Sequence, residues 1–193
     1  MSDPQSALTG AVYQGYVKVA EAGAQGMLTL RGDLPSAVMA EAVKAATGQS
    51  VPAARQIEGG LGTGAAWASP DELLLFCPYS ASAEALEHVS KALEGNHFLA
   101  ADVSDARAVF TLEGSAIRDL LAKLCPADMS PEALPVGDYR RSHIGQVAAA
   151  FWLESESKAT VVCFRSVATY MFDLLKTAAE PGGELRYFAP TAT

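Results

Sequence analysis

Apolar and polar positions alternate in the same order in two successive stretches of the chain, and each stretch predicts a small α+β half. In the first, a short apolar strand over residues 27–31 precedes a helix over residues 36–47. A hairpin then leads into a strand over residues 73–77, and a helix over residues 82–94 follows it. Residues 98–103 are expected to add a closing strand to this half.

The second stretch predicts the same succession of elements. We expect a strand at residues 106–114, a helix at 115–125, hairpin strands at 139–144 and 147–153, a strand at 159–166 and a helix at 167–175. The helix at 115–125 shows the clearest apolar stripe, with the three- and four-residue spacing of a helix face. Ser36 and Ser115 are expected to cap the first helix of their halves, and Gly48 is expected to end the earlier one.

An internal repeat relates the two halves. Residues 28–32 align with residues 110–114, and each segment ends in a glycine before a predicted helix. The succession of strand, helix, two strands and helix is that of a ferredoxin-like unit. The predicted fold class is therefore α+β, with two tandem ferredoxin-like (βαββα-type) halves packed together. The alternative is coincidence, because any two α+β halves look alike at the level of element order.

This pattern predicts four segments. Residues 1–26 carry one apolar patch among small and polar residues, and we expect an N-terminal arm that packs on another surface or stays loose. Residues 27–104 and 105–180 form the two α+β halves. Residues 181–193 form a C-terminal tail.

Composition and charge limit the possible partners. The chain has 193 residues, of which 50% are apolar, so it can bury a large core. Its formal net charge of −8 disfavours nucleic acid and anionic membranes, because clustered Lys and Arg supply affinity for both. No apolar run approaches the roughly 20 residues of a membrane span, and residues 1–6 lack the basic start of a secretory signal. We therefore expect a cytoplasmic protein.

The glycine-rich stretch over residues 59–64 is the most suggestive local motif. A phosphate-binding glycine loop joins an apolar strand to a helix N-terminus, which supplies free N–H groups and a positive dipole end. Here the polar residues 55–58 precede the loop and a turn at residues 69–72 follows soon after it. An exposed hairpin is therefore the favoured interpretation, and nucleotide binding is the alternative.

Metal, redox and hydrolytic chemistry have weak support. The cysteines stand beside apolar residues without a Cys-x-x-Cys spacing and predict reduced core thiols; they are Cys77, Cys125 and Cys163. The histidines fall on different predicted segments, away from a zinc-ligand spacing; they are His88, His97 and His143. Asp102 and Asp105 flank Ser104 without a nearby histidine, so turn capping is favoured over a hydrolase site. The sequence thus predicts no catalytic, cofactor-binding or metal-binding residue.

Three arginines are candidate contacts for another subunit. Arg140 and Arg141 are adjacent in a predicted strand, and Arg165 precedes the last helix. Arg140 and Arg141 could instead clamp an anion or pair with carboxylates of the same chain, and Arg165 could belong to a helix cap region. We place the subunit contact first for Arg140 and Arg141, with pairing inside the chain as the main alternative.

Several short motifs, taken in order, carry a resemblance to a known family. They are Asp-Val-Ser-Asp-Ala-Arg at residues 102–107, Phe-Thr-Leu-Glu-Gly-Ser-Ala at 110–116 and Cys-Phe-Arg-Ser-Val-Ala at 163–168. Over residues 28–179 the chain resembles the gamma subunit of heterotetrameric sarcosine oxidase. The fold of that family is similar to the folate-binding domain of glycine-cleavage T-protein, so the resemblance implies that fold here.

The resemblance also implies a function and partners. That family belongs to a complex that oxidatively demethylates sarcosine to glycine, producing hydrogen peroxide and, with tetrahydrofolate, methylene-tetrahydrofolate. The alpha, beta and delta subunits are the implied partners. FAD, FMN, NAD and tetrahydrofolate are implied in those partner subunits, and no cofactor is implied in this chain.

One departure from the T-protein pattern bears on catalysis by the chain itself. T-protein-like enzymes carry an acidic pair just after the hairpin glycines, where this chain has Ala148 and Ala149. Alanine neither accepts nor delivers a proton. The Lys-Gly-Cys motif of related folate-binding proteins is also missing around Cys163. We therefore expect a non-catalytic subunit that is inactive in isolation; the alternative is a stand-alone folate-like small-molecule binding protein or an aminomethyltransferase-related enzyme.

Overall fold

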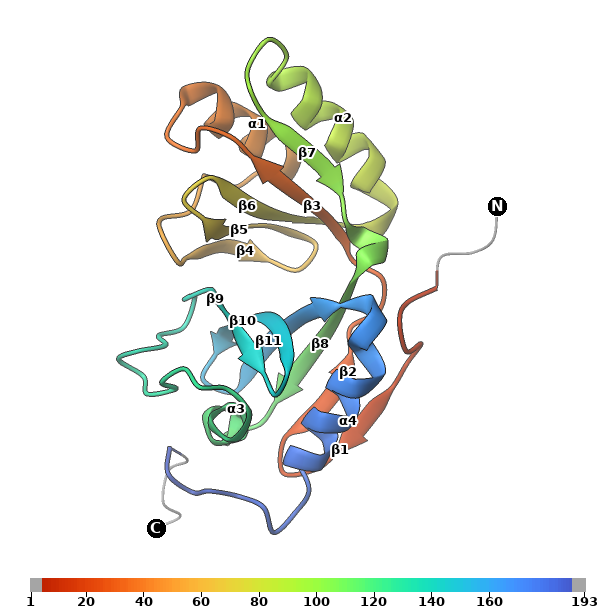
Figure 1. The fold of residues 1–193 in the computed structure, drawn as a ribbon, viewed down its shortest axis with the longest axis vertical. Coiled ribbons are helices and arrows are strands. Elements are labelled where there is room, and N and C mark those ends of the chain that lie inside the picture. The colour runs from red at the N-terminus through yellow and green to blue at the C-terminus, as the bar shows by residue number, and fades with distance from the viewer. Residues whose placement is uncertain (1–4, 189–193) are drawn as a thin grey trace. The chain divides into compact units, whose positions relative to one another are not determined.

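A computed structural model describes residues 5–188 and divides the chain into two compact units (Figure 1). Unit 1 comprises Met1–Ala24 and Ala106–Thr193, and unit 2 comprises Gln25–Asp105. Residues 1–4 of the expected arm and residues 189–193 of the expected tail lie outside the described residues. Each unit contains an antiparallel sheet and two α-helices, which confirms the α+β fold class.

Unit 2 is built from one continuous segment of the chain. Its elements are β3 (Gly26–Arg31), α1 (Ala37–Thr47), β4 (Ile57–Gly60), β5 (Thr63–Ser69), β6 (Glu72–Cys77), α2 (Ser82–Ala92) and β7 (Leu99–Asp102), with short 3-10 turns at Tyr79–Ala81 and Ser104–Ala106. The sheet order is β4-β5-β6-β3-β7. The strands β5, β6, β3 and β7 thus form the four-stranded sheet of a ferredoxin-like unit, and β4 extends it as a hairpin partner of β5.

The first helix of unit 2 begins and ends where local chemistry dictates. The Ser36 side chain accepts a hydrogen bond from the backbone N–H of Met39 at 3.3 Å, which satisfies one free donor of the first turn. Gly48 ends the helix at φ +73°, a left-handed conformation in which glycine carries no steric penalty. The predicted capping roles of Ser36 and Gly48 are therefore confirmed.

Unit 1 combines the N-terminal segment with the second half of the chain. Its elements are β1 (Val12–Gln14), β2 (Lys18–Glu21), β8 (Arg107–Glu113), α3 (Ile117–Leu124), β9 (Arg140–Ile144), β10 (Val147–Ser155), β11 (Lys158–Phe164), a 3-10 turn at Arg165–Val167 and α4 (Ala168–Ala178). The sheet order is β1-β2-β8-β11-β10-β9. The predicted helix, hairpin and strands of the second half are all present.

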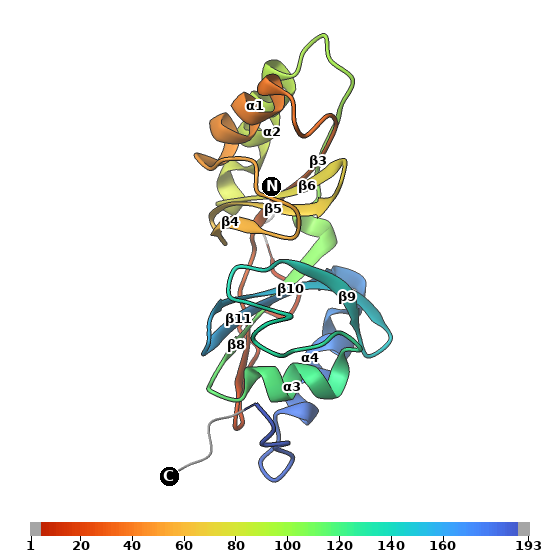
Figure 2. The same ribbon diagram turned by 90° about the vertical axis from the view of Figure 1, so that its left-hand side faces the viewer.

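The repeat is visible in the strand order of the two sheets. Strand β3 lies between β6 and β7, and strand β8 lies in the matching place between β11 and β2. In each unit both helices cover the same face of the sheet (Figure 2). The predicted equivalence of residues 28–30 and 110–112 is therefore confirmed.

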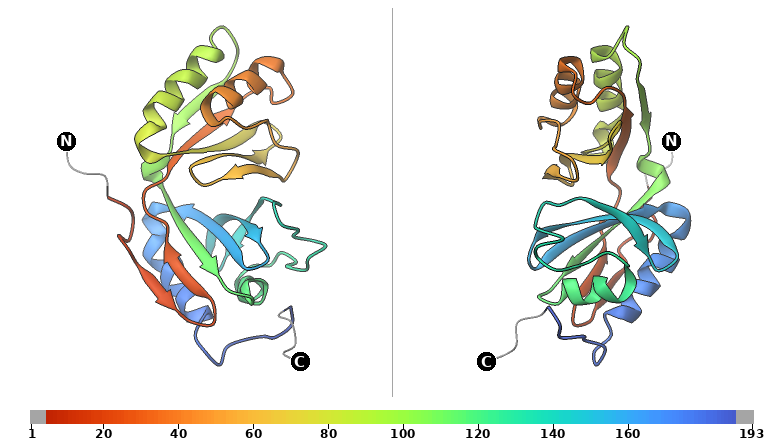
Figure 3. Two further views of the ribbon diagram at one scale, coloured as in Figure 1. Left: turned by 180° about the vertical axis from the view of Figure 1, so that it is seen from behind. Right: turned by 60° about the vertical axis from the view of Figure 1, so that its left-hand side comes forward.

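Residues 12–21 of the expected N-terminal arm pack on the sheet of unit 1 as two strands. Strand β2 pairs with β8 in register Val19↔Leu112, and β1 pairs with β2 at the outer edge of the sheet (Figure 3). Val17 and Val19 are fully buried in the core of unit 1. Strand β2 takes the closing position that β7 takes in unit 2, because an unpaired β8 would leave open N–H and C=O groups along its edge.

Helix α3 begins later than its sequence predicts. Residues 115 and 116 form a turn, and Ala116 is the N-cap without any side-chain capping bond. The predicted capping role of Ser115 is therefore wrong. The apolar stripe of this helix is present, with Ile117, Leu120 and Leu121 fully buried.

The cores are apolar and contain all three thiols of the chain. Cys77, Cys125 and Cys163 are buried and free, as expected of reduced core thiols. Burial raises the pKa of Cys163 to about 11, and the nearby Arg107 only partly offsets this effect. A thiol with so high a pKa stays protonated at neutral pH and is a poor nucleophile.

Candidate functional site

The adjacent arginines Arg140 and Arg141 have different surroundings on β9. A terminal nitrogen of the Arg140 guanidinium donates to the carboxylate of Asp138 at 2.9 Å and to the carbonyl of Ala133. Asp138 is itself 3% exposed, so this buried pair joins β9 to the loop that precedes it. Arg140 thus takes the alternative of pairing inside the chain. Arg141 is exposed on the edge strand.

The third candidate arginine contacts the N-terminal segment. Arg165 Nη2 donates to the carbonyl oxygens of Gln5 at 2.7 Å and Ser6 at 3.2 Å. These bonds fasten residues that precede β1 to the start of α4. Arg165 and Arg140 therefore serve separate segments of unit 1, and their contact with another subunit remains a prediction, as it does for Arg141.

The glycine-rich stretch is a hairpin. Strands β4 and β5 pair through Gly59↔Gly64 and Gly60↔Thr63, and the two-residue turn between them has Gly62 at φ +92°. A strand rather than a helix follows the turn, so the N-terminal N–H groups of a phosphate-binding loop are not provided here. The favoured hairpin interpretation is confirmed.

Ser104 is occupied by structural hydrogen bonds. Its hydroxyl donates to the Asp102 carboxylate and accepts from the backbone N–H of Met27 at 2.9 Å. Burial by itself would raise the pKa of Asp102, but bonds from the hydroxyl and N–H of Ser104 and from the hydroxyl of Ser82 together lower it. The group fixes the turn that ends unit 2, which agrees with the favoured capping role.

The two alanines of the hairpin β9–β10 lie on opposite faces of the sheet. Ala149 is 7% exposed and packs in the core under the helices of unit 1, whereas Ala148 is exposed and pairs across from His143. Side chains of neighbouring strand residues point to opposite faces. A carboxylate at position 149 would therefore enter the core, and one at position 148 would lie on the other face.

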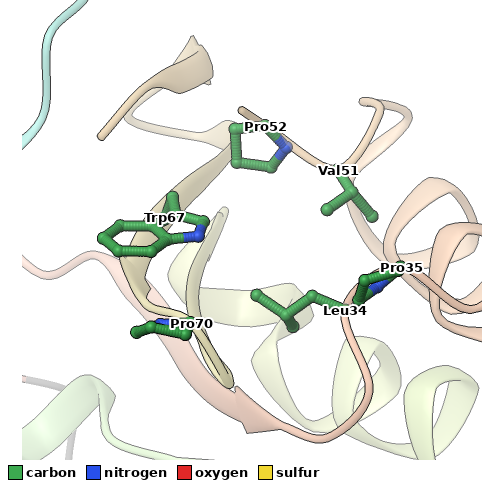
Figure 4. Close-up of a pocket in the computed structure, with 6 residues that line it drawn as sticks. All are labelled: Leu34, Pro35, Val51, Pro52, Trp67 and Pro70. Carbon is green, nitrogen blue, oxygen red and sulfur yellow. The ribbon is translucent and has the colours of Figure 1, made fainter. Parts of the chain in front are cut away.

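An apolar pocket of about 370 Å³ lies within unit 2 (Figure 4). Its lining consists of apolar side chains from the loops around α1, from β5 and from the β5–β6 turn: Leu34, Pro35, Val51, Pro52, Trp67 and Pro70. Trp67 and Pro70 stand on one side of the open centre, Leu34 and Val51 on the other, and Pro52 lies at the top between Trp67 and Val51. Such a lining favours an apolar group, since it presents no charged side chain to a ligand.

Two buried charges on α3 were missed by the sequence analysis. Arg118 is 5% exposed and donates to the carbonyls of Met129 at 3.0 Å and Leu134 at 2.8 Å, and to both carboxylate oxygens of Glu156. Asp119 is fully buried although it lies away from the apolar stripe of the helix. Arg118 fixes the long loop between α3 and β9. The sequence gives no sign of this role, because the bonded carbonyls are 11 and 16 residues after Arg118.

The histidines remain apart, as their spacing indicates. His88 lies 3.9 Å from Glu84 on α2, and His97 and His143 are exposed on other segments. Among residues 5–188, no three His, Cys, Asp or Glu side chains gather in a way that could hold a metal ion. Within the same range, no helix has the length and apolar character needed to cross a membrane.

Similar proteins were found by sequence. A model of the family described as "Sarcosine oxidase, gamma subunit family" matches residues 31–180. The protein "Sarcosine oxidase subunit gamma" from Corynebacterium sp. (strain U-96) is 31% identical over 125 residues, which cover 64% of this chain and 60% of that protein. The chain thus spans less than two thirds of that relative.

Similar proteins were also found by structure. A chain in the heterotetrameric sarcosine oxidase from Corynebacterium sp. U-96, in complex with pyrrole 2-carboxylate, matches with a TM-score of 0.77 and 27% identity, covering 87% of this chain and 86% of that chain. The glycine cleavage system aminomethyltransferase T from Bartonella henselae matches with a TM-score of 0.59 and 12% identity, covering 80% and 44%. The second likeness concerns the fold alone and confirms its T-protein-like character.

Proposed function

We propose that this chain, which belongs to the sarcosine oxidase gamma subunit family, is the non-catalytic gamma subunit of a heterotetrameric sarcosine oxidase. The complex oxidatively demethylates sarcosine to glycine and produces hydrogen peroxide, together with methylene-tetrahydrofolate when tetrahydrofolate is present. Its other members are alpha, beta and delta subunits. FAD, FMN, NAD and tetrahydrofolate bind to those partners rather than to this chain.

The observation that carries the non-catalytic role is the chemistry of β10. Residues 147–150 offer only hydrocarbon side chains where a T-protein-like enzyme needs carboxylates, and Ala149 is already packed into the core. Folate bound against this strand would face methyl groups with its polar ring edge. Each buried donor left unpaired would cost about 1–3 kcal/mol.

The remaining conspicuous polar groups have structural partners. Asp102 is held by Ser104, and Arg118 is held by two backbone carbonyls and Glu156. A catalytic acid or base needs a free reacting proton position within reach of a substrate. The partners of Asp102 and Arg118 therefore indicate a structural role for both residues rather than a role in proton transfer.

The pocket beside Trp67 also argues against sarcosine as a ligand of this chain. Sarcosine carries an ammonium and a carboxylate, and both need polar partners when they leave water. The six lining side chains carry no charge and no acceptor for an ammonium group, and the indole N–H of Trp67 is their single donor. This chemistry favours the subunit role over the alternative of a stand-alone binder.

Among the candidate contact arginines, Arg141 fits a subunit contact best. Arg141 is exposed on the edge strand β9, whereas Arg140 and Arg165 are only partly exposed. An exposed arginine on a sheet edge can reach a carboxylate of a partner, and its planar guanidinium can bind that carboxylate through two hydrogen bonds. We therefore retain Arg141 first, with Arg140 and Arg165 as further candidates.

Calorimetry of the isolated chain with tetrahydrofolate tests the non-catalytic role. We expect no binding at micromolar concentrations, no flavin absorbance in the purified chain and no peroxide on addition of sarcosine. Binding of tetrahydrofolate in the micromolar range would instead support the stand-alone folate-binding protein. The same titration with Ala148→Asp asks whether a carboxylate on the exposed face creates affinity, without the core damage expected of Ala149→Asp.

A further inference from the structure

The segment after α4 crosses unit 1 beside α3, and we call residues 183–188 the C-terminal strap (Figure 2). It follows the region matched by the family model, which ends at residue 180. Two side chains of α3, Asp119 and Lys123, bond to its backbone. The strap is therefore held by a helix that lies more than 50 residues earlier in the sequence.

Asp119 is the main anchor of the strap. Its carboxylate oxygen accepts hydrogen bonds from the backbone N–H groups of Tyr187 at 3.1 Å and Phe188 at 2.8 Å. Arg186, just before them, has φ +55°, a left-handed conformation that is uncommon for a residue with a side chain. Consecutive N–H groups after such a residue form a concave anion-binding nest, and here the anion is the chain's own carboxylate.

Lys123 supplies a second anchor. Its ammonium donates to the carbonyls of Ala178 at 2.6 Å and Gly183 at 2.7 Å, and lies 5.2 Å from the centre of the Tyr16 ring. The end of α4 and the start of the strap are thus joined through one side chain. Together the two anchors fix both ends of the strap.

The anchored backbone displays apolar side chains to solvent. Phe188 packs against the core of unit 1, and the Tyr187 ring meets it edge to face with centroids 4.7 Å apart. Tyr187 itself is 79% exposed, and Leu185 is 50% exposed. The buried carboxylate of Asp119 and the left-handed backbone of Arg186 thus fix a segment whose two large side chains, Tyr187 and Leu185, are exposed.

We propose that the strap is a docking element that inserts Tyr187, with Leu185 beside it, into a pocket on a partner protein; this rests on the proposed subunit function. A segment whose backbone is already fixed loses little conformational entropy on association. Tyrosine is enriched among the residues that dominate binding energy at protein interfaces. The strap is thus suited to contribute a central contact from very few residues.

The charge around the strap favours a protein over a membrane surface. Glu180 precedes the strap, Glu184 lies within it, and Arg186 is its single basic residue. Binding to anionic lipid headgroups relies on clusters of Lys and Arg, which this segment lacks in a chain of net charge −8. A protein pocket for an aromatic ring, with a basic group near the two glutamates, is the complementary surface.

The test measures association of the full chain with the co-expressed partner subunits. We expect Tyr187→Ala to weaken association about tenfold to thirtyfold, and Tyr187→Phe to retain most of the affinity because the ring remains. Tyr170→Ala is the matched control, since Tyr170 is 45% exposed on α4, away from the strap. Equal affinity of Tyr187→Ala and wild type would overturn the docking role, whereas failure of the wild-type chain to associate would overturn the proposed function itself.

Limited trypsin digestion of the isolated chain tests the anchor separately. In Asp119→Asn, which keeps the side-chain shape but not its charge, we expect cleavage after Arg186 to accelerate severalfold, because the nest holds a neutral acceptor less firmly. Cleavage after exposed Arg55 in unit 2 should stay unchanged and controls for global unfolding. Lys123→Met provides a second variant. Unchanged cleavage after Arg186 in both variants would overturn the anchored strap.

Discussion

Units 1 and 2 have the same strand order, yet the chain completes their sheets in different ways. In unit 2 the closing strand β7 comes from the same continuous segment and lies at the sheet edge, where Leu99 is 52% exposed. In unit 1 the closing strand β2 comes from the N-terminal segment, β1 covers its outer side, and Val19 is fully buried. In a ferredoxin-like sheet the closing strand can thus follow the other strands in sequence, as β7 does, or precede them, as β2 does.

The units also differ in how they use charge. Among the described residues, every buried charged side chain belongs to unit 1: Glu21, Arg118, Asp119 and Asp138. Glu21 accepts from Ser6 and Gly23, Arg118 bonds to the α3–β9 loop, Asp119 bonds to the strap, and Asp138 joins that loop to β9 through Arg140. Unit 1 therefore holds its long α3–β9 loop and the strap with buried charges, a device that the described residues of unit 2 do not use.

Substitution of the two closing strands should show the largest difference. Val19→Asp places a carboxylate in the core of unit 1 without a partner, and we expect a loss of about 3 kcal/mol or more of unfolding free energy. Leu99→Asp, opposite Arg31 on β3, should change stability by less than about 1 kcal/mol. Urea denaturation followed by tryptophan fluorescence measures both. Similar losses in the two variants would contradict the contrast between a buried and an exposed closing strand.

Arginine substitutions should show the next largest difference. Arg118→Ala leaves the carbonyls of Met129 and Leu134 without their donor, and we expect a loss of roughly 2–4 kcal/mol. Arg31→Ala in unit 2 removes the ion pairs of a half-exposed guanidinium with Asp71 and Glu72, worth about 0–1 kcal/mol. Thermal unfolding of the two variants provides the comparison. A small effect of Arg118→Ala would show that the loop before β9 does not depend on this buried guanidinium.

Helix capping should produce a smaller but clear difference. Ser36→Ala removes the hydrogen bond to the N–H of Met39 and should cost about 1 kcal/mol. Ser115→Ala should change stability by only a few tenths of a kcal/mol, because Ala116 is the N-cap of α3. Chemical denaturation under the same conditions measures both. An equal cost at the two positions would restore the capping role that the sequence predicts for Ser115.

The smallest expected effect is on how stability depends on pH in the acid range. Hydrogen bonds from Ser104 and Ser82 outweigh burial and lower the pKa of Asp102 in unit 2, while the N–H and hydroxyl of Ser130 lower the pKa of Asp128 in unit 1. A lowered folded-state pKa contributes stability above the unfolded value of 3.8, and this contribution is lost as pH falls through the folded-state pKa.

Carboxyl titration by NMR tests this acid effect. In Ser104→Ala we expect the pKa of Asp102 to rise toward its ordinary value and the loss of stability below pH 4 to shrink. Asp128 should titrate as in the wild type, since its partners are in the other unit. An unchanged pKa of Asp102 would show that Ser104 does not stabilise its charged form.

The parts of this fold that depend on local chemistry could be predicted from sequence. The hairpin around Gly62, the start of α1 at Ser36 and the buried strand β10 each follow from residues within a few positions. The role of β2 could not be predicted, because its partner Leu112 lies in the second half of the chain. Asp119 shows the same limit: its position on the helix indicates exposure, yet it is fully buried and bonds to the distant strap.

The candidate site was predictable mainly through motifs rather than chemistry. The family resemblance rested on short blocks around Asp102, Phe110 and Cys163, and the family match over residues 31–180 confirms it. The expected contact arginines were chosen by charge alone, which does not reveal that Arg140 pairs with Asp138 or that Arg165 holds Gln5. The apolar pocket has no sequence signal of its own, because its six residues come from four separate segments of unit 2.

The proposed role as a non-catalytic subunit is tested most directly by co-purification. The tagged chain is co-expressed with the alpha, beta and delta subunits from the same source, and sarcosine-dependent peroxide production is measured for the purified assembly and for the chain alone. We predict that the chain is recovered in equal amount with its partners, that the assembly produces peroxide, and that the isolated chain does not. Peroxide from the isolated chain, or an active assembly from which this chain is absent, would contradict the proposal.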